Sequence, residues 1–290
     1  MRTGAVSVSV SVAVVAAVLA AGTAGCGAGR HDPDVVVDGT PPATPYAGPL
    51  LVPTQEVDGH TVRDLLLASG AAGRALECDG RPYAGTGPDG WSRRDGGGTP
   101  EDGLRLYFDR DEPELPRHGY RVERREAHRV LYSFDVAGRT KVAVVVAEDQ
   151  EHRPGWGPET TAACDPSELP ASATRGYEIW TDRAGRRLPV AEISSAAGPE
   201  HCGWQRAHFL TLGRDEDART YARDPDGVLD PDVLTAPYRA GVRLPPAARD
   251  TGRRYGEREL WLTADRTKVY VRTPHGVEAW PALRGGVGCM

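Results

Sequence analysis

Alternation of apolar and polar residues predicts a β-hairpin near the middle of the chain. The segment 130–136, Val-Leu-Tyr-Ser-Phe-Asp-Val, places an apolar side chain at every second position, as in a strand with one buried face. A turn containing glycine leads from it to 139–144, Arg-Thr-Lys-Val-Ala-Val. A second hairpin is predicted where 260–262, Leu-Trp-Leu, continue through Asp265 to 266–271, Arg-Thr-Lys-Val-Tyr-Val.

Helix starts precede both hairpins. Thr99 offers a capping hydroxyl before Pro100 at the first helical position, and acidic residues follow in the first turn. The sequence Asp-Pro-Asp at 230–232 has the same features. A further helix is expected over 62–75, while 177–193 is expected to form a hairpin around a turn at 182–185.

The cysteines and lysines repeat in register. Cys164 follows Cys78 by 86 positions, and Cys289 follows Cys202 by 87. Lys141 and Lys268, the only lysines, occupy the same Arg-Thr-Lys-Val tetrapeptide, and a tryptophan precedes the closing cysteine of each interval at 156 and 280. We interpret these landmarks as an internal duplication. The alternative is convergence of two generic helix-and-hairpin units.

The N-terminus has the features of an export signal. Arg2 precedes an uncharged, mostly apolar stretch to residue 21, and small residues then lead to Cys26. The sequence Thr-Ala-Gly-Cys at 23–26 resembles the bacterial lipobox, which implies that residues 1–25 are a signal peptide and that Cys26 carries the lipid. The alternative is an ordinary signal peptide with a chance cysteine. Residues 26–49, rich in Gly, Pro and Asp, are expected to be a flexible tether.

The net charge of the chain mainly excludes one class of partner. The chain has a formal net charge of −6, so nucleic acid is not an expected partner. Arginine carries almost all positive charge, and this bias is typical of high-GC actinobacterial proteins.

Motifs for catalysis or cofactors are not evident. Residues 85–90 fit the dinucleotide-binding glycine pattern, but no strand is expected before them, so we interpret them as a loop and expect no cofactor. The acidic run 224–232 is interpreted as a solvated loop and a helix cap, because its spacing does not fit a calcium loop. Of the eight histidines only His201 adjoins a cysteine, so in an exported protein disulfides are favoured over a zinc site. No catalytic and no metal-binding residue is assigned.

Two tryptophans and the two repeated lysines form a candidate binding surface: Trp156, Trp280, Lys141 and Lys268. Glycines and prolines surround Trp156, so a loop tip is expected to expose it. The alternative is that most tryptophans pack in the core and that the lysines are solvent-facing strand residues.

Four segments resemble uncharacterised secreted lipoproteins of actinobacteria: 78–80 (Cys-Asp-Gly), 120–124, 139–142 and 201–204 (His-Cys-Gly-Trp). The resemblance implies no particular activity. The predicted fold is α+β, with two tandem units at 50–168 and 169–290. Each unit is a short helix packed on a small antiparallel sheet, closed by a disulfide (Cys78–Cys164 and Cys202–Cys289).

The functional hypothesis is an exported protein anchored by lipid to the outer face of the cell membrane. It would be a noncatalytic binding or interaction module for an envelope protein or a glycan. The alternatives are an extracytoplasmic hydrolase and a structural or protective component of the envelope.

Overall fold

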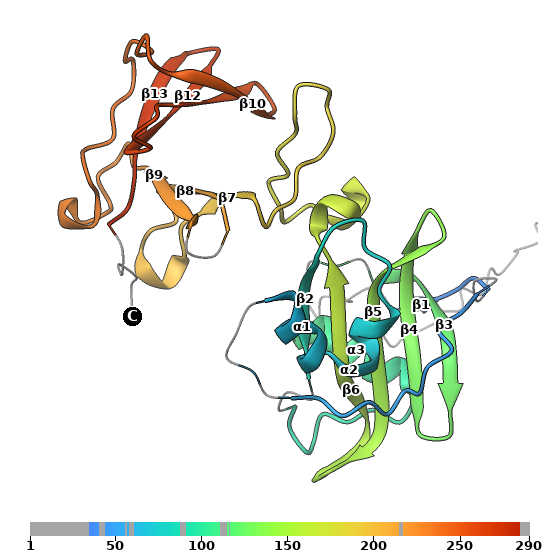
Figure 1. Cartoon of the computed structure of the whole chain (residues 1–290). Coiled ribbons are helices and arrows are strands. Elements are labelled where there is room, and N and C mark those ends of the chain that lie inside the picture. Colours follow the sequence, from blue (N-terminus) through green and yellow to red (C-terminus); the bar gives the residue numbers. More distant parts are fainter. Residues whose placement is uncertain are drawn as a thin grey trace, which may run out of the picture. The chain divides into compact units, whose positions relative to one another are not determined.

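The hairpin predicted at 130–144 forms the middle of the larger sheet (Figure 1). Strands β4 (Arg129–Val136) and β5 (Arg139–Gln150) pair antiparallel. Ala137 and Gly138 connect them with φ values of 52° and 76°, which is the two-residue turn that matches strand twist. The sheet has six strands in the order β1-β3-β4-β5-β6-β2. Its other members are β1 (Val36–Val37), β2 (Pro82–Thr86), β3 (His118–Glu126) and β6 (Arg153–Cys164).

The computed structural model describes residues 35–40, 44–55, 57, 61–87, 91–110, 115, 117–214 and 217–284. The predicted signal peptide at 1–25, Cys26 as the predicted site of lipid attachment, and Cys289 lie outside this set. Within it, no helix combines the length and the apolar character needed to cross a membrane.

Strand β5 is buried on both faces because helices cover both. The side chains of Val142, Val144 and Val146 pack with helix α3 (Pro100–Arg110). The intervening Ala143 and Val145 pack with helix α2 (Gly70–Ala75) on the other face. A continuous apolar run is the sequence pattern of such a strand.

The helix starts behave differently in the two halves. Thr99 caps α3 as predicted: its hydroxyl accepts from the backbone N–H of Asp102 at 3.2 Å, and Asp102 Oδ2 accepts from the Thr99 N–H at 3.0 Å. The helix expected after Asp230 is a single 3₁₀ turn, Pro231–Val233. Pro237 follows closely, and a proline disfavours helical backbone at the residue before it.

The second half contains two smaller sheets. Strands β7 (Ile193–Ala197), β8 (His208–Leu212) and β9 (Arg219–Arg223) form one in chain order. The predicted hairpin at 260–271 lies in the other, whose four antiparallel strands also follow chain order. These are β10 (Arg249–Tyr255), β11 (Arg258–Leu262), β12 (Lys268–Thr273) and β13 (Gly276–Pro281).

The protein is therefore a mixed fold of helices and strands, mostly sheet with few helices. The disulfide Cys78–Cys164 is present. Cys202 is also disulfide-bonded, but its expected partner Cys289 lies outside the described residues, so that pairing stays a prediction. In the described part of the second half the helical segments are 3₁₀ turns, so a helix packed on each sheet is not observed there.

Candidate functional site

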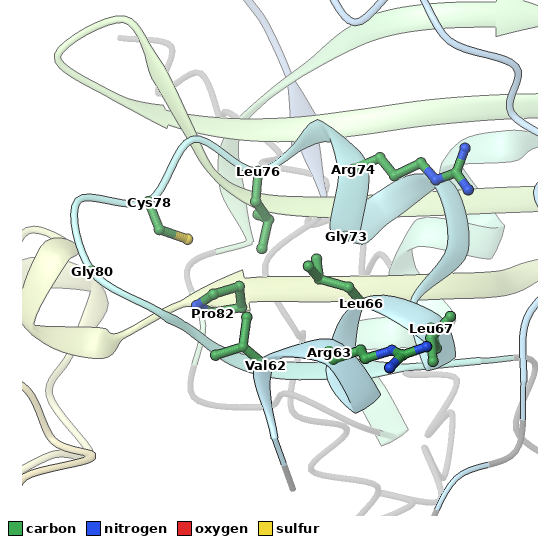
Figure 2. Close-up of a pocket in the computed structure, with 10 residues that line it drawn as sticks. All are labelled: Val62, Arg63, Leu66, Leu67, Gly73, Arg74, Leu76, Cys78, Gly80 and Pro82. Carbon is green, nitrogen blue, oxygen red and sulfur yellow. The ribbon is translucent and has the colours of Figure 1, made fainter. Parts of the chain in front are cut away.

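A mostly apolar cleft of about 740 Å³ lies beside the first two helices (Figure 2). Helix α1 (Val62–Ala68) forms one side, and α2 with the segment leading to β2 forms the other. Its apolar lining comes from Val62, Leu66, Leu67, Leu76 and Pro82. A volume of this size is typical of small-molecule sites.

The wall at 77–80 is held by a buried carboxylate. Glu168 lies just after β6, and its two oxygens accept the backbone N–H groups of Asp79 at 2.7 Å and Gly80 at 2.9 Å. Lys141 Nζ donates to Glu168 Oε2 at 2.7 Å, to Asp79 Oδ2 at 3.0 Å and to the Glu77 carbonyl at 2.9 Å. The hydrogen bond from Lys141 and a contact from Arg139 keep the pKa of the Asp79 carboxyl below its ordinary value. These bonds fix a segment that has no regular secondary structure.

The disulfide joins the same wall to the large sheet. Cys78 lines the cleft, and its partner Cys164 is the last residue of β6. The two sulfurs and Glu168 lie close together, in a group that could suggest a metal site. Because a metal binds thiolate sulfur and both sulfurs are bonded to each other, this group is not a metal site.

The helical wall is also fixed locally. The hydroxyl of Thr61 accepts the N–H of Asp64, and the Asp64 carboxylate accepts the Thr61 N–H, so α1 begins with a capping box. Ser69, between the helices, donates to the Leu65 carbonyl at 2.5 Å. A Cβ on Gly73 would collide with the Ser69 hydroxyl, so glycine permits the close approach of α1 and α2.

Two arginines border the cleft. Arg63 and Arg74 are exposed, and in Figure 2 both guanidinium groups lie on the side away from Cys78. Neither forms an ion pair with a carboxylate within the residues that the structure describes, whereas Arg129 contacts Glu159 at 2.8 Å in the same half. The cleft therefore combines an apolar interior with two arginines at its border that no described carboxylate pairs with.

Three of the four residues proposed for a binding surface are buried, which corrects that hypothesis. Trp156 is 8% exposed and Trp280 is 1% exposed, and the Lys141 side chain is only 3% exposed. Lys268 is half-buried at the start of β12. None of the four lines the cleft.

Local backbone features explain these corrections. Asp135 pairs with Thr140 and Phe134 pairs with Val142, so Lys141 is the extra residue of a β-bulge, and a bulge redirects a side chain. The residues around Trp156 continue strand β6 instead of forming a loop tip. The Gly97 N–H donates to the Trp156 carbonyl at 2.8 Å, and the Trp156 N–H donates to the Gly97 carbonyl at 2.9 Å. Strand β2 likewise includes Gly85, so the loop predicted at 85–90 is wrong for its first residues.

A second polar group lies in the other half. Ser195 donates to Glu178 Oε2, and His208 Nε2 lies 2.9 Å from the same oxygen. Burial disfavours the charged carboxylate, but the hydrogen bonds from His208 and Ser195 outweigh it, so the pKa of Glu178 lies below its ordinary value. Ser195 also accepts from Trp180 Nε1 at 2.9 Å. In a catalytic triad the histidine lies between the serine and the acid. Here Glu178 lies between Ser195 and His208. His208 is therefore not placed to take the proton of Ser195.

The acidic run at 224–232 forms a loop and the cap of a 3₁₀ turn, but Asp224 is buried and not solvated. Asp224 accepts the backbone N–H groups of Val228 at 2.9 Å and Leu229 at 3.0 Å. Its carboxylate thus stabilises the chain's own turn.

Comparison of the chain with protein-family models, curated proteins and solved structures returned no match.

The sequence predicted the helices of the cleft but not the cleft. One signal was available: Leu65, Leu66 and Leu67 are consecutive, and successive side chains on a helix point about 100° apart. Three adjacent leucines cannot all face one core. Leu66 is in fact 39% exposed, and it points into the cleft in Figure 2.

Proposed function

We propose that this chain is an exported, lipid-anchored envelope protein that acts as a noncatalytic binding module, with its ligand in the cleft between α1, α2 and the segment before β2. The observation that carries the proposal is the cleft itself: an apolar space of about 740 Å³ whose walls are fixed by hydrogen bonds and a disulfide of the chain's own. A site whose walls are already ordered binds with a smaller loss of conformational entropy.

Several observations favour binding over the alternatives. Titratable groups that converge on a reacting centre are the usual mark of an enzyme. The cleft lining offers two arginines as its titratable side chains besides the disulfide-bonded cysteine. The Glu178 group, which favours the hydrolase alternative through its residue types, does not have the order of a serine hydrolase.

We also propose that the chain descends from two tandem units and is related to actinobacterial secreted lipoproteins. Both Arg-Thr-Lys-Val segments occur at the second strand of an antiparallel hairpin. Val142 and Val269, the last residues of the two segments, are both buried in cores. The expected second bridge, Cys202–Cys289, belongs to the same proposal.

The binding proposal is tested with an uncharged dye whose fluorescence rises in apolar surroundings. We expect saturable binding of the dye to the purified chain, with one site per molecule. Leu66→Trp should fill the cleft and abolish the signal, whereas Leu51→Trp, a control at a 60% exposed leucine, should leave it unchanged. Equal binding by both variants would show that the dye does not report the cleft, and the proposal would fail.

The anchor is tested separately in cells. The wild-type protein should incorporate a fatty-acid analogue and fractionate with membranes, while the Cys26→Ser variant should be unlabelled and released. A labelled, membrane-bound Cys26→Ser variant would disprove the anchor.

A further inference from the structure

We propose that the ligand of the α1–α2 cleft is a free fatty acid, with its aliphatic chain along Leu66, Leu76 and Pro82 and its carboxylate at one of the two arginines that border the cleft, Arg63 or Arg74. This inference rests on the proposed function and adds the chemical class of the ligand.

The apolar interior favours an aliphatic chain. Besides the two arginines, the lining presents leucine, valine and proline side chains, the glycines Gly73 and Gly80, and a cysteine whose sulfur is bonded in the disulfide. A peptide would place its backbone amides against these groups, and each amide left without a hydrogen bond would oppose binding. A sugar would lack the aromatic surface on which sugars stack, because the lining contains no aromatic residue. A hydrocarbon chain has no polar group to satisfy, so it suits this surface.

The charge at the cleft favours an acidic head group. The whole chain carries a net charge of −6, and many of its arginines are paired with carboxylates, such as Arg105 with Asp102 and Arg129 with Glu159. Arg63 and Arg74 both border the cleft and are not paired within the described residues. Asp64, next to Arg63, is engaged in the cap of α1. One arginine binds a carboxylate group through two parallel hydrogen bonds, so either side chain is a suitable partner for an acidic head.

The arrangement also gives the ligand a direction. In Figure 2 the guanidinium groups of Arg63 and Arg74 lie on the side away from Cys78, while Leu76 and Pro82 lie nearer to it. An amphiphile would place its acidic end at the arginines and its tail toward the disulfide. A single chain suits one cleft of about 740 Å³, so we assign a free fatty acid and not a two-chain lipid.

The test is displacement of the bound dye by three ligands of equal chain length: dodecanoate, dodecanol and dodecylammonium, each below its micelle concentration. We expect dodecanoate to bind about tenfold more tightly than dodecanol, and dodecylammonium to bind most weakly, because one charge-assisted contact is worth roughly a factor of ten. Added salt should weaken the binding of dodecanoate and leave that of dodecanol unchanged.

Variants assign the head-group site. The double variant Arg63→Gln and Arg74→Gln should lose the preference for dodecanoate over dodecanol and keep the affinity for dodecanol. Arg94→Gln, a control at an exposed arginine of the same half, should behave as the wild type.

The possible outcomes distinguish failure of the proposed function from failure of the fatty-acid inference. If the dye does not bind, the proposed function fails. If the dye binds but dodecanoate and dodecanol displace it equally, or if the double variant keeps the preference, the fatty-acid inference alone is overturned. Binding to anionic phospholipid vesicles without binding of monomeric dodecanoate would also overturn it, in favour of attachment to a membrane surface.

Discussion

Lys141 Nζ lies 2.7 Å from Glu168 Oε2, and both side chains are almost fully buried beside the wall of the cleft. The pair links β5 to the residues after β6, and Glu168 in turn holds the backbone of Asp79 and Gly80. A buried charge that loses its partner is strongly destabilising, because its desolvation is no longer offset. Removal of either partner should therefore destabilise both the fold and the cleft wall.

The first prediction compares the two repeated lysines. Lys141→Met should lower the free energy of unfolding by about 3 kcal/mol, since it leaves Glu168 buried without its charged partner. Lys268→Met, the matched change at a half-buried position, should lower it by less than about 0.5 kcal/mol. Urea unfolding measures both values. Equal effects would mean that the Lys141 pair contributes no special stabilisation.

The two lysines show which features of this fold could be predicted from the sequence and which could not. Apolar alternation located the hairpins at 130–144 and 260–271 correctly, and the residues Val142 and Val269 that follow the two lysines are both in cores. The hairpin expected over 177–193 is wrong as a pair of strands, because within this fully described segment only the isolated bridge Thr181–Arg187 forms. The burial of Lys141 could not be read from the sequence, because it depends on a bulge opposite Phe134 and Asp135 and on a carboxylate 27 residues away.

The α1–α2 cleft could also be predicted from the sequence only in part. Helical structure over 62–75 was predicted from local residues, and the structure has two helices there, α1 and α2. The break between them at Ser69 coincides with Gly70, whose φ is 50°, which is a local feature. The approach of the segment before β2 depends on long-range contacts, the disulfide Cys78–Cys164 among them. Trp156 failed as a surface residue for a related reason: glycines and prolines indicate a loop locally, but pairing with β5 extends the strand through them.

The second prediction concerns the disulfide Cys78–Cys164. Replacing both cysteines by serine should lower the free energy of unfolding by about 4 to 5 kcal/mol, because a loop that spans 86 positions gains freedom in the unfolded chain. The same variant should bind the apolar dye more weakly, since Cys78 is part of the cleft wall. Urea unfolding and dye titration are the measurements. A loss of less than about 1 kcal/mol would contradict the prediction.

The third prediction is the pairing of Cys202 with Cys289. Cys202 is disulfide-bonded, and the repeated spacing predicts Cys289 as its partner. Peptide mapping without reduction, on protein exported by its native host, should yield a peptide that joins the two. A free Cys289 thiol, or a peptide that joins Cys202 to another cysteine, would remove the main chemical support for the duplication.

The fourth prediction concerns Glu178 and pH. The pKa of this carboxyl lies below its ordinary value of 4.5 in the folded protein, since the hydrogen bonds from His208 and Ser195 favour the charged form more than burial disfavours it. A carboxyl with a lowered folded pKa adds stability that is fully present above the unfolded pKa and is lost as pH falls through the folded pKa. Glu178→Gln keeps the shape but removes this charge.

We therefore expect Glu178→Gln to unfold about 1 to 2 kcal/mol more easily than the wild type at pH 7, the value of hydrogen bonds to a charged group. The difference should shrink as pH falls below about 4.5, where the carboxyl of the unfolded chain becomes protonated, and should be lost once pH is below the lower pKa of the folded protein. Glu200→Gln, a control at an exposed glutamate in the same half, should match the wild type at every pH. Urea unfolding at steps between pH 3 and pH 7 tests this, and a difference between Glu178→Gln and wild type that stays constant with pH would show that the charge of Glu178 does not stabilise the fold.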